Sequence, residues 1–131
     1  MIRGTTAQFN FKLPCTKGDL IWVTVKFWQQ GNSGTPEAPL PIKKTRDHCV
    51  GELDANEVCI SLTAEETARF SDKIKAQVQF RAQRMDGTVF GNKTRYITVY
   101  PMRDDILDDD IPIIPEANEE ALIVFDAGTV I

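Results

Sequence analysis

The chain has few residues whose types and spacing could support catalysis or metal binding. Soft ligands are limited to His48 with the neighbouring Cys49, and to Cys15 and Cys59 elsewhere in the sequence. Structural zinc requires about four well-placed ligands, commonly in C-x-x-C pairs, and no such pair is present. A Cys–His nucleophile pair would also need a third, orienting group, and adjacent residues of an extended chain point apart. We therefore expect no catalytic residue, no metal site and no cofactor, and we predict that the protein is not an enzyme.

The acidic residues near the end of the chain are a second group that could bind a ligand. Five aspartates lie between residues 104 and 110. The segment lacks the central glycine and closing glutamate of a calcium-binding EF-hand loop. Residues 1–103 hold all 15 Lys and Arg and 10 of the 19 Asp and Glu, whereas residues 104–131 hold the other 9 acids and no base. This asymmetry indicates either a solvated acidic tail or a tail that docks on a basic surface of its own body or of a neighbouring copy.

Two tryptophans are the best candidates for a binding surface. If Ile21, Val23, Val25 and Phe27 face the core, then Trp22 and Trp28 share the opposite, solvent face of the same strand. Aromatic side chains are enriched at interfaces, although the chain's own C-terminal arm or the loop at residues 30–41 could cover them. Apolar residues of the arm are the other candidates. The predicted interaction residues are Trp22, Trp28, Ile111, Ile113, Leu122, Val124 and Phe125.

The elements that position these residues are predicted to be short strands. Alternating apolar side chains indicate strands at residues 6–13, 20–29, 58–62 and 74–83, with Ile74, Ala76, Val78, Phe80 and Ala82 facing inward in the last. Residues 40–45 form a possible edge strand. Asp86-Gly87 predicts a hairpin with a type I′ turn, and the return strand over residues 88–100 is expected to kink at Gly91-Asn92.

A capping box formed by Thr63 and Glu66 predicts one short helix at residues 63–71, with Phe70 closing one end of the core. Short strands separated by turns predict an all-β fold, an immunoglobulin-like β-sandwich of about 6–8 strands, with a small barrel as the alternative. We expect a sandwich domain at residues 1–100. Residues 101–131 are expected to form an acidic-aliphatic C-terminal arm with short strands.

Composition also restricts the compartment and the partners. No apolar stretch approaches the roughly 18 residues that a membrane helix needs, and the start lacks the features of a signal peptide, so we expect neither a membrane association nor secretion. The odd cysteine count favours a reducing compartment such as a bacterial cytoplasm. A net charge of -4 and the lack of a known motif argue against nucleic-acid binding.

Several motifs, in order, resemble a known group of proteins. The chain opens with Arg3-Gly-Thr and an alternating aromatic strand ending in Leu13-Pro14, and then has Gln29-Gln-Gly31 after a long strand. Ser61 to Phe70 and the Asp86-Gly87 hairpin follow. Residues 1–100 are in this respect similar to small prophage structural proteins related to the N-terminal domain of phage baseplate upper proteins. The Pro-rich insert at residues 30–41 and the arm depart from that pattern.

This resemblance implies an immunoglobulin-like adaptor of a phage tail or baseplate, made in the bacterial cytoplasm and located in the virion. It implies no catalytic residues and no cofactor. The expected partners are other phage structural proteins, and a second copy that binds through the C-terminal arm is the other candidate. The alternative is a soluble binding module of the bacterial host, for carbohydrate or protein, that uses the tryptophans as a stacking platform.

Overall fold

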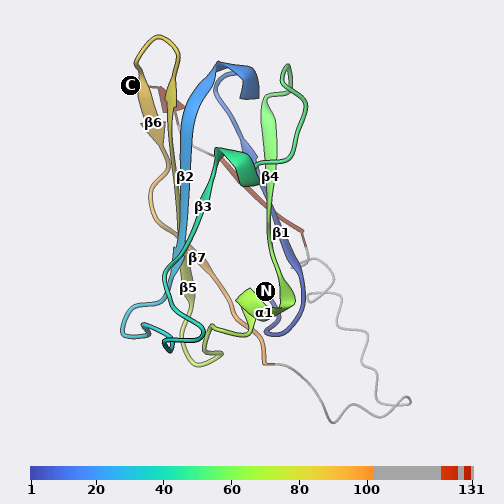
Figure 1. Ribbon diagram of the computed structural model, residues 1–131, viewed down its shortest axis with the longest axis vertical. Helices are drawn as coiled ribbons and strands as arrows, with labels where there is room; N and C mark the ends of the chain where they lie inside the picture. Colours follow the sequence, from blue (N-terminus) through green and yellow to red (C-terminus); the bar gives the residue numbers. More distant parts are fainter. Residues whose placement is uncertain (102–121, 127–128, 131) are drawn as a thin grey trace, which may run out of the picture.

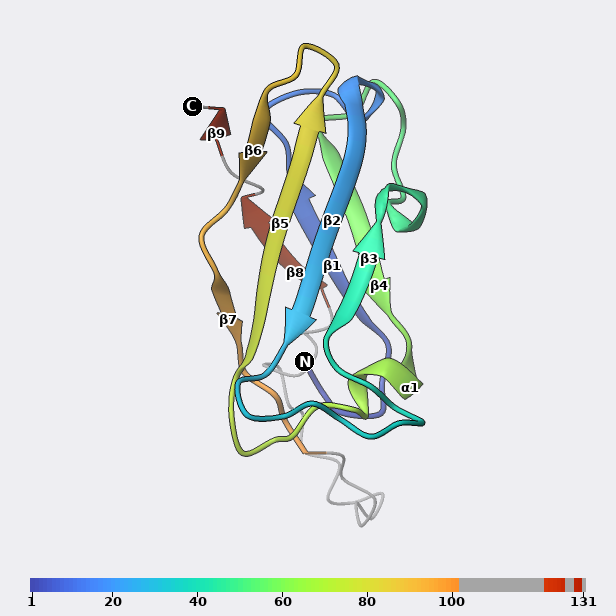
Figure 2. The same cartoon turned by 60° about the vertical axis from the view of Figure 1, so that its left-hand side comes forward.

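The protein folds as two β-sheets packed face to face in the computed structural model, which describes residues 1–101, 122–126 and 129–130 (Figure 1). The smaller sheet contains, in spatial order, β4 (Glu57–Leu62), β1 (Ala7–Lys12) and β8 (Leu122–Asp126). The larger sheet contains β3 (Ile42–Thr45), β2 (Leu20–Trp28), β5 (Ala76–Arg84), β6 (Val89–Gly91) and β9 (Thr129–Val130). A sixth strand, β7 (Arg95–Ile97), pairs with the first half of β5 (Figure 2). The prediction of an all-β sandwich is confirmed.

Strand pairing is antiparallel except between β1 and β8, which run parallel. Seven strands lie within residues 1–100, while β8 and β9 lie within residues 101–131 and add to different sheets. Short 3-10 helices at Lys17–Asp19 and Arg46–His48 precede β2 and follow β3. Among the residues that the structure describes, no helix has the length and apolar character needed to cross a membrane.

One apolar core fills the space between the two sheets. Phe9 of β1 packs on Phe27 of β2 with ring centroids 5.0 Å apart, and Phe11 of β1 stacks on Phe80 of β5 at the same separation. These four rings are fully buried. Burying one such side chain stabilises the fold by about 1.5–3 kcal/mol, so the alternating phenylalanines of β1 hold the two layers together.

Helix α1 (Ala64–Thr67) lies at the end of the sandwich and begins with the predicted capping box. The Glu66 backbone N–H donates to Thr63 Oγ1 at 3.1 Å, and the Thr63 backbone N–H donates to Glu66 Oε1 at 2.9 Å. The α-helix is shorter than the predicted 63–71, because the hydrogen bonds after Thr67 tighten into turns that reach Phe70. Phe70 is fully buried there, as predicted.

The prediction that Ile21 faces the core is wrong. Its side chain is 52% exposed, and Leu20 is buried instead. The pairing of β2 with β5 shifts between Leu20 and Trp22, so one extra residue bulges from the ladder and interrupts the alternation. From Val23 onward the predicted inward residues are buried.

Two further predictions near β5 also need correction. Ile74 is 42% exposed, because β5 begins only at Ala76. The hairpin after Arg84 forms, but not as a type I′ turn, which requires positive φ at two successive residues. Within the described residues only glycines have positive φ, and Gly87 at +89° is the one in this turn. The Gly87 N–H donates to the Arg84 carbonyl at 2.9 Å and so closes the turn over Met85 and Asp86.

The return strand breaks where a kink was predicted. The Phe80 backbone N–H donates to the side-chain Oδ1 of Asn92 at 2.9 Å, so an amide side chain takes the place of a strand carbonyl. A Cβ on Gly91 would lie 2.7 Å from the Phe80 carbonyl oxygen, which is too close for any side chain. The segment therefore divides into β6 and β7, both of which remain paired with β5.

Candidate interaction surface

The solvent side of the larger sheet is the part of the molecule best suited to bind a partner. Alternation along β2 after the bulge directs Trp22, Thr24, Lys26 and Trp28 outward, between the buried Val23, Val25 and Phe27. The two tryptophans share one face, as predicted. The bulge before Trp22 leaves the preceding residue, Ile21, exposed as well.

Neighbouring strands extend this surface in register. Lys26 of β2 lies opposite Lys43 of β3 and Gln79 of β5, and Trp28 lies opposite Gln77, which in turn pairs with Tyr96 of β7. We call the resulting surface the tryptophan face. It comprises Trp22, Thr24, Lys26, Trp28, Lys43, Thr45, Gln77, Gln79, Arg81, Gln83, Val89 and Tyr96.

The tryptophan face contains three basic residues and no acidic residue. Lys26 and Lys43 are directly opposite each other, an arrangement that destabilises a sheet because like charges are brought together. Arg81 lies next to them on β5, opposite Thr24. The charged side chains of the tryptophan face are therefore all positive.

The two tryptophans occupy opposite ends of the face and have different surroundings. Six residues of extended strand separate them by about 20 Å. Trp22 is 37% exposed and its indole Nε1–H donates to Gln83 Oε1 at 2.7 Å. Trp28 is partly buried, and the Lys26 Nζ lies 5.2 Å from its ring centroid, in a cation–π contact. They are therefore two separate aromatic contacts rather than one stacking platform.

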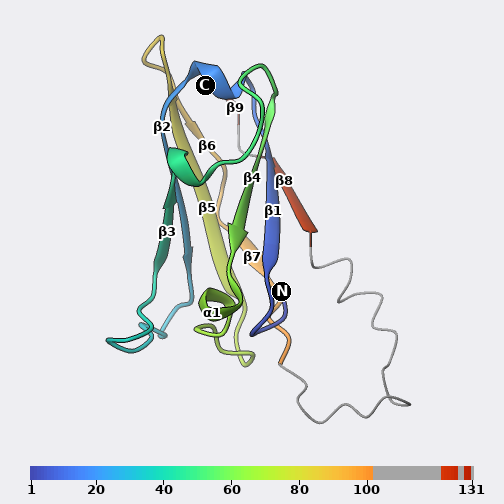
Figure 3. The ribbon, with the colours of Figure 1, turned by 45° about the vertical axis from the view of Figure 1, so that its right-hand side comes forward.

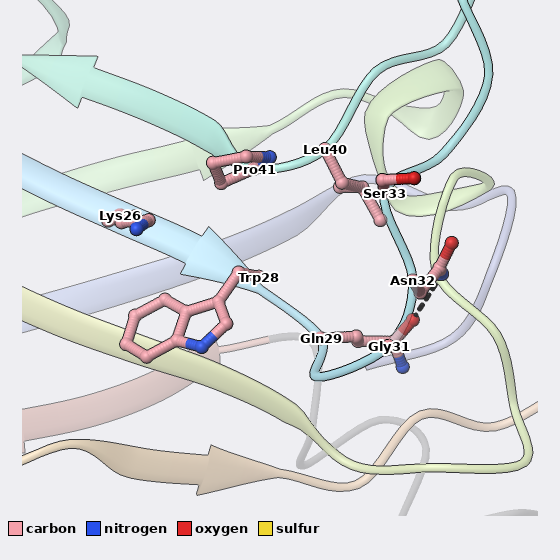
Figure 4. A pocket seen from close by; sticks show the side chains of 8 residues that line it. All are labelled: Lys26, Trp28, Gln29, Gly31, Asn32, Ser33, Leu40 and Pro41. Atoms are coloured by element: carbon pink, nitrogen blue, oxygen red, sulfur yellow. Dashed lines mark hydrogen bonds between the residues drawn. The ribbon is translucent and has the colours of Figure 1, made fainter.

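A shallow groove of about 380 Å³ lies beside Trp28 (Figure 4). The loop after β2 contributes Leu40 and Pro41 to its lining, on the other side of β2 from the Trp28 indole ring. Its amide side chains already have internal partners: Gln29 donates to the carbonyls of Ser71 and Ile74, and Asn32 donates to Gln29 Oε1. The groove thus offers an indole, a proline and a lysine rather than a set of polar groups directed at a ligand.

The C-terminal strands do not lie over the tryptophan face. β8 pairs with β1 in the opposite sheet, and β9 pairs with β6 at the edge of the larger sheet (Figure 3). The predicted contact residues Leu122, Val124 and Phe125 lie on β8, in register with Gln8, Asn10 and Phe11 of β1. The other two, Ile111 and Ile113, lie outside the described residues.

His48 and the neighbouring Cys49 do not form a reactive pair. His48 is exposed and its Nδ1 accepts a hydrogen bond from the Thr45 N–H at 3.0 Å, whereas Cys49 is buried. Burial raises the pKa of the Cys49 thiol to about 11, against the opposing charges of Lys17 and Arg46. Such a thiol is protonated near neutral pH and is a poor nucleophile. All three cysteines are free, and within the described residues no group of three His, Cys, Asp or Glu could hold a metal ion.

Some residues of this surface were not foreseen from the sequence. Tyr96, Lys43 and Arg81 come from strands whose neighbours are decided by the sheet order, so their alternation alone did not place them beside the tryptophans. The inward residues predicted at 76–82 imply that Arg81 alternates outward, but this pattern does not say which strand lies beside it. No protein-family model matches this chain, and the search of curated proteins gives no match.

Proposed function

We propose that the protein is a non-enzymatic structural adaptor of a phage tail or baseplate, which binds another structural protein through the tryptophan face. The observation that supports a binding role most strongly is that this face combines three aromatic residues and three basic residues with no acid. The ordered motifs of residues 1–100 support the phage assignment by resemblance. An immunoglobulin-like arrangement of the sandwich is part of the same proposal.

The chemistry of the face fits a protein partner. Tryptophan, tyrosine and arginine are the residues that most often contribute large binding energies at interfaces. Gln79 lies opposite Lys26 in the middle of the face, between the aromatic ends, and adds an amide group to it. An adaptor needs a rigid surface more than a movable loop, and a sheet face supported by a buried core provides one.

The proposal is tested on phage particles. A tagged copy of the chain is expressed during prophage induction, and purified particles are analysed by mass spectrometry. We expect the chain to be present together with the tail proteins. Particles that contain every tail protein but lack this chain would contradict the structural role.

A matched pair of variants then tests the surface. Trp22→Ala combined with Trp28→Ala should remove the chain from particles while leaving its circular dichroism spectrum unchanged. Gln8→Ala combined with Ser61→Ala changes exposed residues on the opposite sheet and should leave incorporation unchanged. Equal incorporation of both variants would show that the tryptophan face is not the binding surface.

The groove beside Trp28 favours one alternative function, a carbohydrate-binding module of the bacterial host. Indole rings stack on sugar faces, and this ring borders a groove large enough for a small ligand. A bound sugar would have to displace Lys26 from the ring and would find the groove's amides engaged with the protein. Binding on a glycan array that disappears in Trp28→Ala would support this alternative over the adaptor.

A further inference from the structure

A segment of the same chain has a charge opposite to that of the tryptophan face. Residues 104–120 contain eight acids and no Lys or Arg, together with five Ile and Leu residues. Carboxylates suit Lys26, Lys43 and Arg81, and aliphatic side chains suit the indoles at the two ends of the face. The face and the segment therefore complement each other in both charge and apolar character.

The described residues on either side of this segment both lie near the start of β1, away from the tryptophan face. Tyr100 forms a parallel bridge with Ile2, and Leu122 pairs with Gln8, so the chain leaves and rejoins the fold near the start of β1. β1 belongs to the smaller sheet, on the opposite side of the sandwich from the outward side of β2 and β3 (Figure 3). Both described ends of the segment thus lie on the side opposite the tryptophan face, whereas the face of a second copy can be reached without passing around the sandwich.

We propose that residues 104–120 of a second copy are the occupant of the tryptophan face. The contact is between two different surfaces, so every bound copy still offers one free face and one free acidic segment. Such heterologous contacts produce rings or open chains of subunits rather than closed two-fold dimers. This inference rests on the proposed role of the tryptophan face and names its partner.

The inference requires self-association that depends on concentration and on salt. Light scattering coupled to size-exclusion chromatography should give an average mass above the 14.7 kDa of one chain, and the mass should rise with concentration. Because the contact is electrostatic, raising the salt from about 50 mM to about 500 mM should lower the average mass. A single-chain mass at all concentrations and at low salt would overturn the inference.

Charge variants of the full chain identify the two surfaces. Lys26→Glu with Lys43→Glu should weaken self-association about tenfold or more, because attraction is replaced by repulsion. Self-association should also weaken when the acidic segment loses charge through the combined changes Asp108→Asn, Asp109→Asn and Asp110→Asn. Lys73→Glu with Lys93→Glu alters two exposed loop lysines by the same total charge and should change nothing. If the charge reversal disturbs the circular dichroism spectrum, the milder variant Lys26→Gln with Lys43→Gln is used in its place.

Mixing the two weakened variants provides the decisive result. One variant retains its acidic segment and the other retains its face, so an equimolar mixture should form a one-to-one pair that cannot grow further. A mixture that remains at single-chain mass contradicts the inference, and so does self-association that survives the face reversal. A monomeric chain that still copurifies with phage particles would reject this inference alone and leave the adaptor role standing.

Discussion

The outward face formed by β1 and β4 differs sharply in chemistry from the tryptophan face, although both arise from alternating strands. On the smaller sheet the outward side chains of β1 and β4 are Gln8, Asn10, Lys12, Glu57, Cys59 and Ser61. These are small or polar, and they include both signs of charge. The tryptophan face instead has three aromatic residues and only basic charges. Alternation alone thus identifies a solvent-exposed face, whereas the neighbouring strands decide which residues that face contains.

The inward faces of the two sheets, by contrast, pack into a single apolar core. A cavity in this core should lower the free energy of unfolding more than any change on the outward faces. Phe80 of β5 contacts Phe11 in the opposite sheet and Phe90 in its own. Phe80→Ala should reduce the free energy of unfolding by about 3–5 kcal/mol through the cavity it leaves. Urea denaturation measures this loss, and Phe80→Leu should lose clearly less. A loss below about 1 kcal/mol would mean that the two sheets do not share one core.

The ion pair between Lys44 and Glu66 links the larger sheet to the helix that follows β4. The Lys44 Nζ lies 2.8 Å from Glu66 Oε2, and both side chains are largely buried. Glu66→Ala should lower the free energy of unfolding by about 1–3 kcal/mol, because it leaves a buried ammonium without its partner and removes half of the capping box. Glu65→Ala, on the exposed side of the same turn, should cost about 0.5 kcal/mol or less.

This pair also predicts a pH dependence. Burial alone would raise the pKa of Glu66, but hydrogen bonds from Lys44 and Thr63 outweigh it and hold the pKa below the ordinary 4.5. A lowered pKa means that the carboxylate stabilises the fold above pH 4.5, and that this contribution is lost as the pH falls through the folded-state pKa. The difference in stability between the wild type and Glu66→Gln should therefore shrink on acidification. A difference that does not change with pH would contradict this origin.

The hydrogen bond at Trp22 tests how far the tryptophan face contributes to the fold itself. Trp22→Phe removes the donor to Gln83 but retains an aromatic ring, and it should lower the free energy of unfolding by about 0.5–1.5 kcal/mol. Gln83→Leu removes the acceptor and provides the matching control. If the bond carries the effect, the double variant should lose less than the sum of the two single losses, as a thermal denaturation cycle can measure.

The smallest expected effect is an increase, rather than a decrease, in the free energy of unfolding. Lys43→Glu converts a like-charge pair across β2 and β3 into an opposite-charge pair, so it should increase the free energy of unfolding by about 0.2–1 kcal/mol. The same change should weaken self-association. A variant that is more stable but binds less would show that the lysine pair is kept for binding. A destabilised variant would remove this interpretation.

Much of the fold could be predicted from the sequence because the relevant signals are local. Residues 9, 11 and 13 are buried on one side of their strand because strict alternation of apolar and polar residues has only one satisfactory orientation. The capping box at Thr63 involves partners three residues apart, and it formed as predicted. The predictions for Ile21, Ile74 and the turn type failed because a bulge, a strand start and backbone dihedral angles depend on the partner strand.

The sequence by itself determined that the chain has one apolar core, alternating strands, a capped turn of helix and two outward tryptophans. These properties follow from side-chain period and from hydrogen bonds between near neighbours. Only the tertiary structure decided that β3, β5 and β7 surround those tryptophans, and that they bring Lys43, Arg81 and Tyr96 to the same face. Strand order depends on pairing between distant segments, and no local pattern specifies which segments become neighbours.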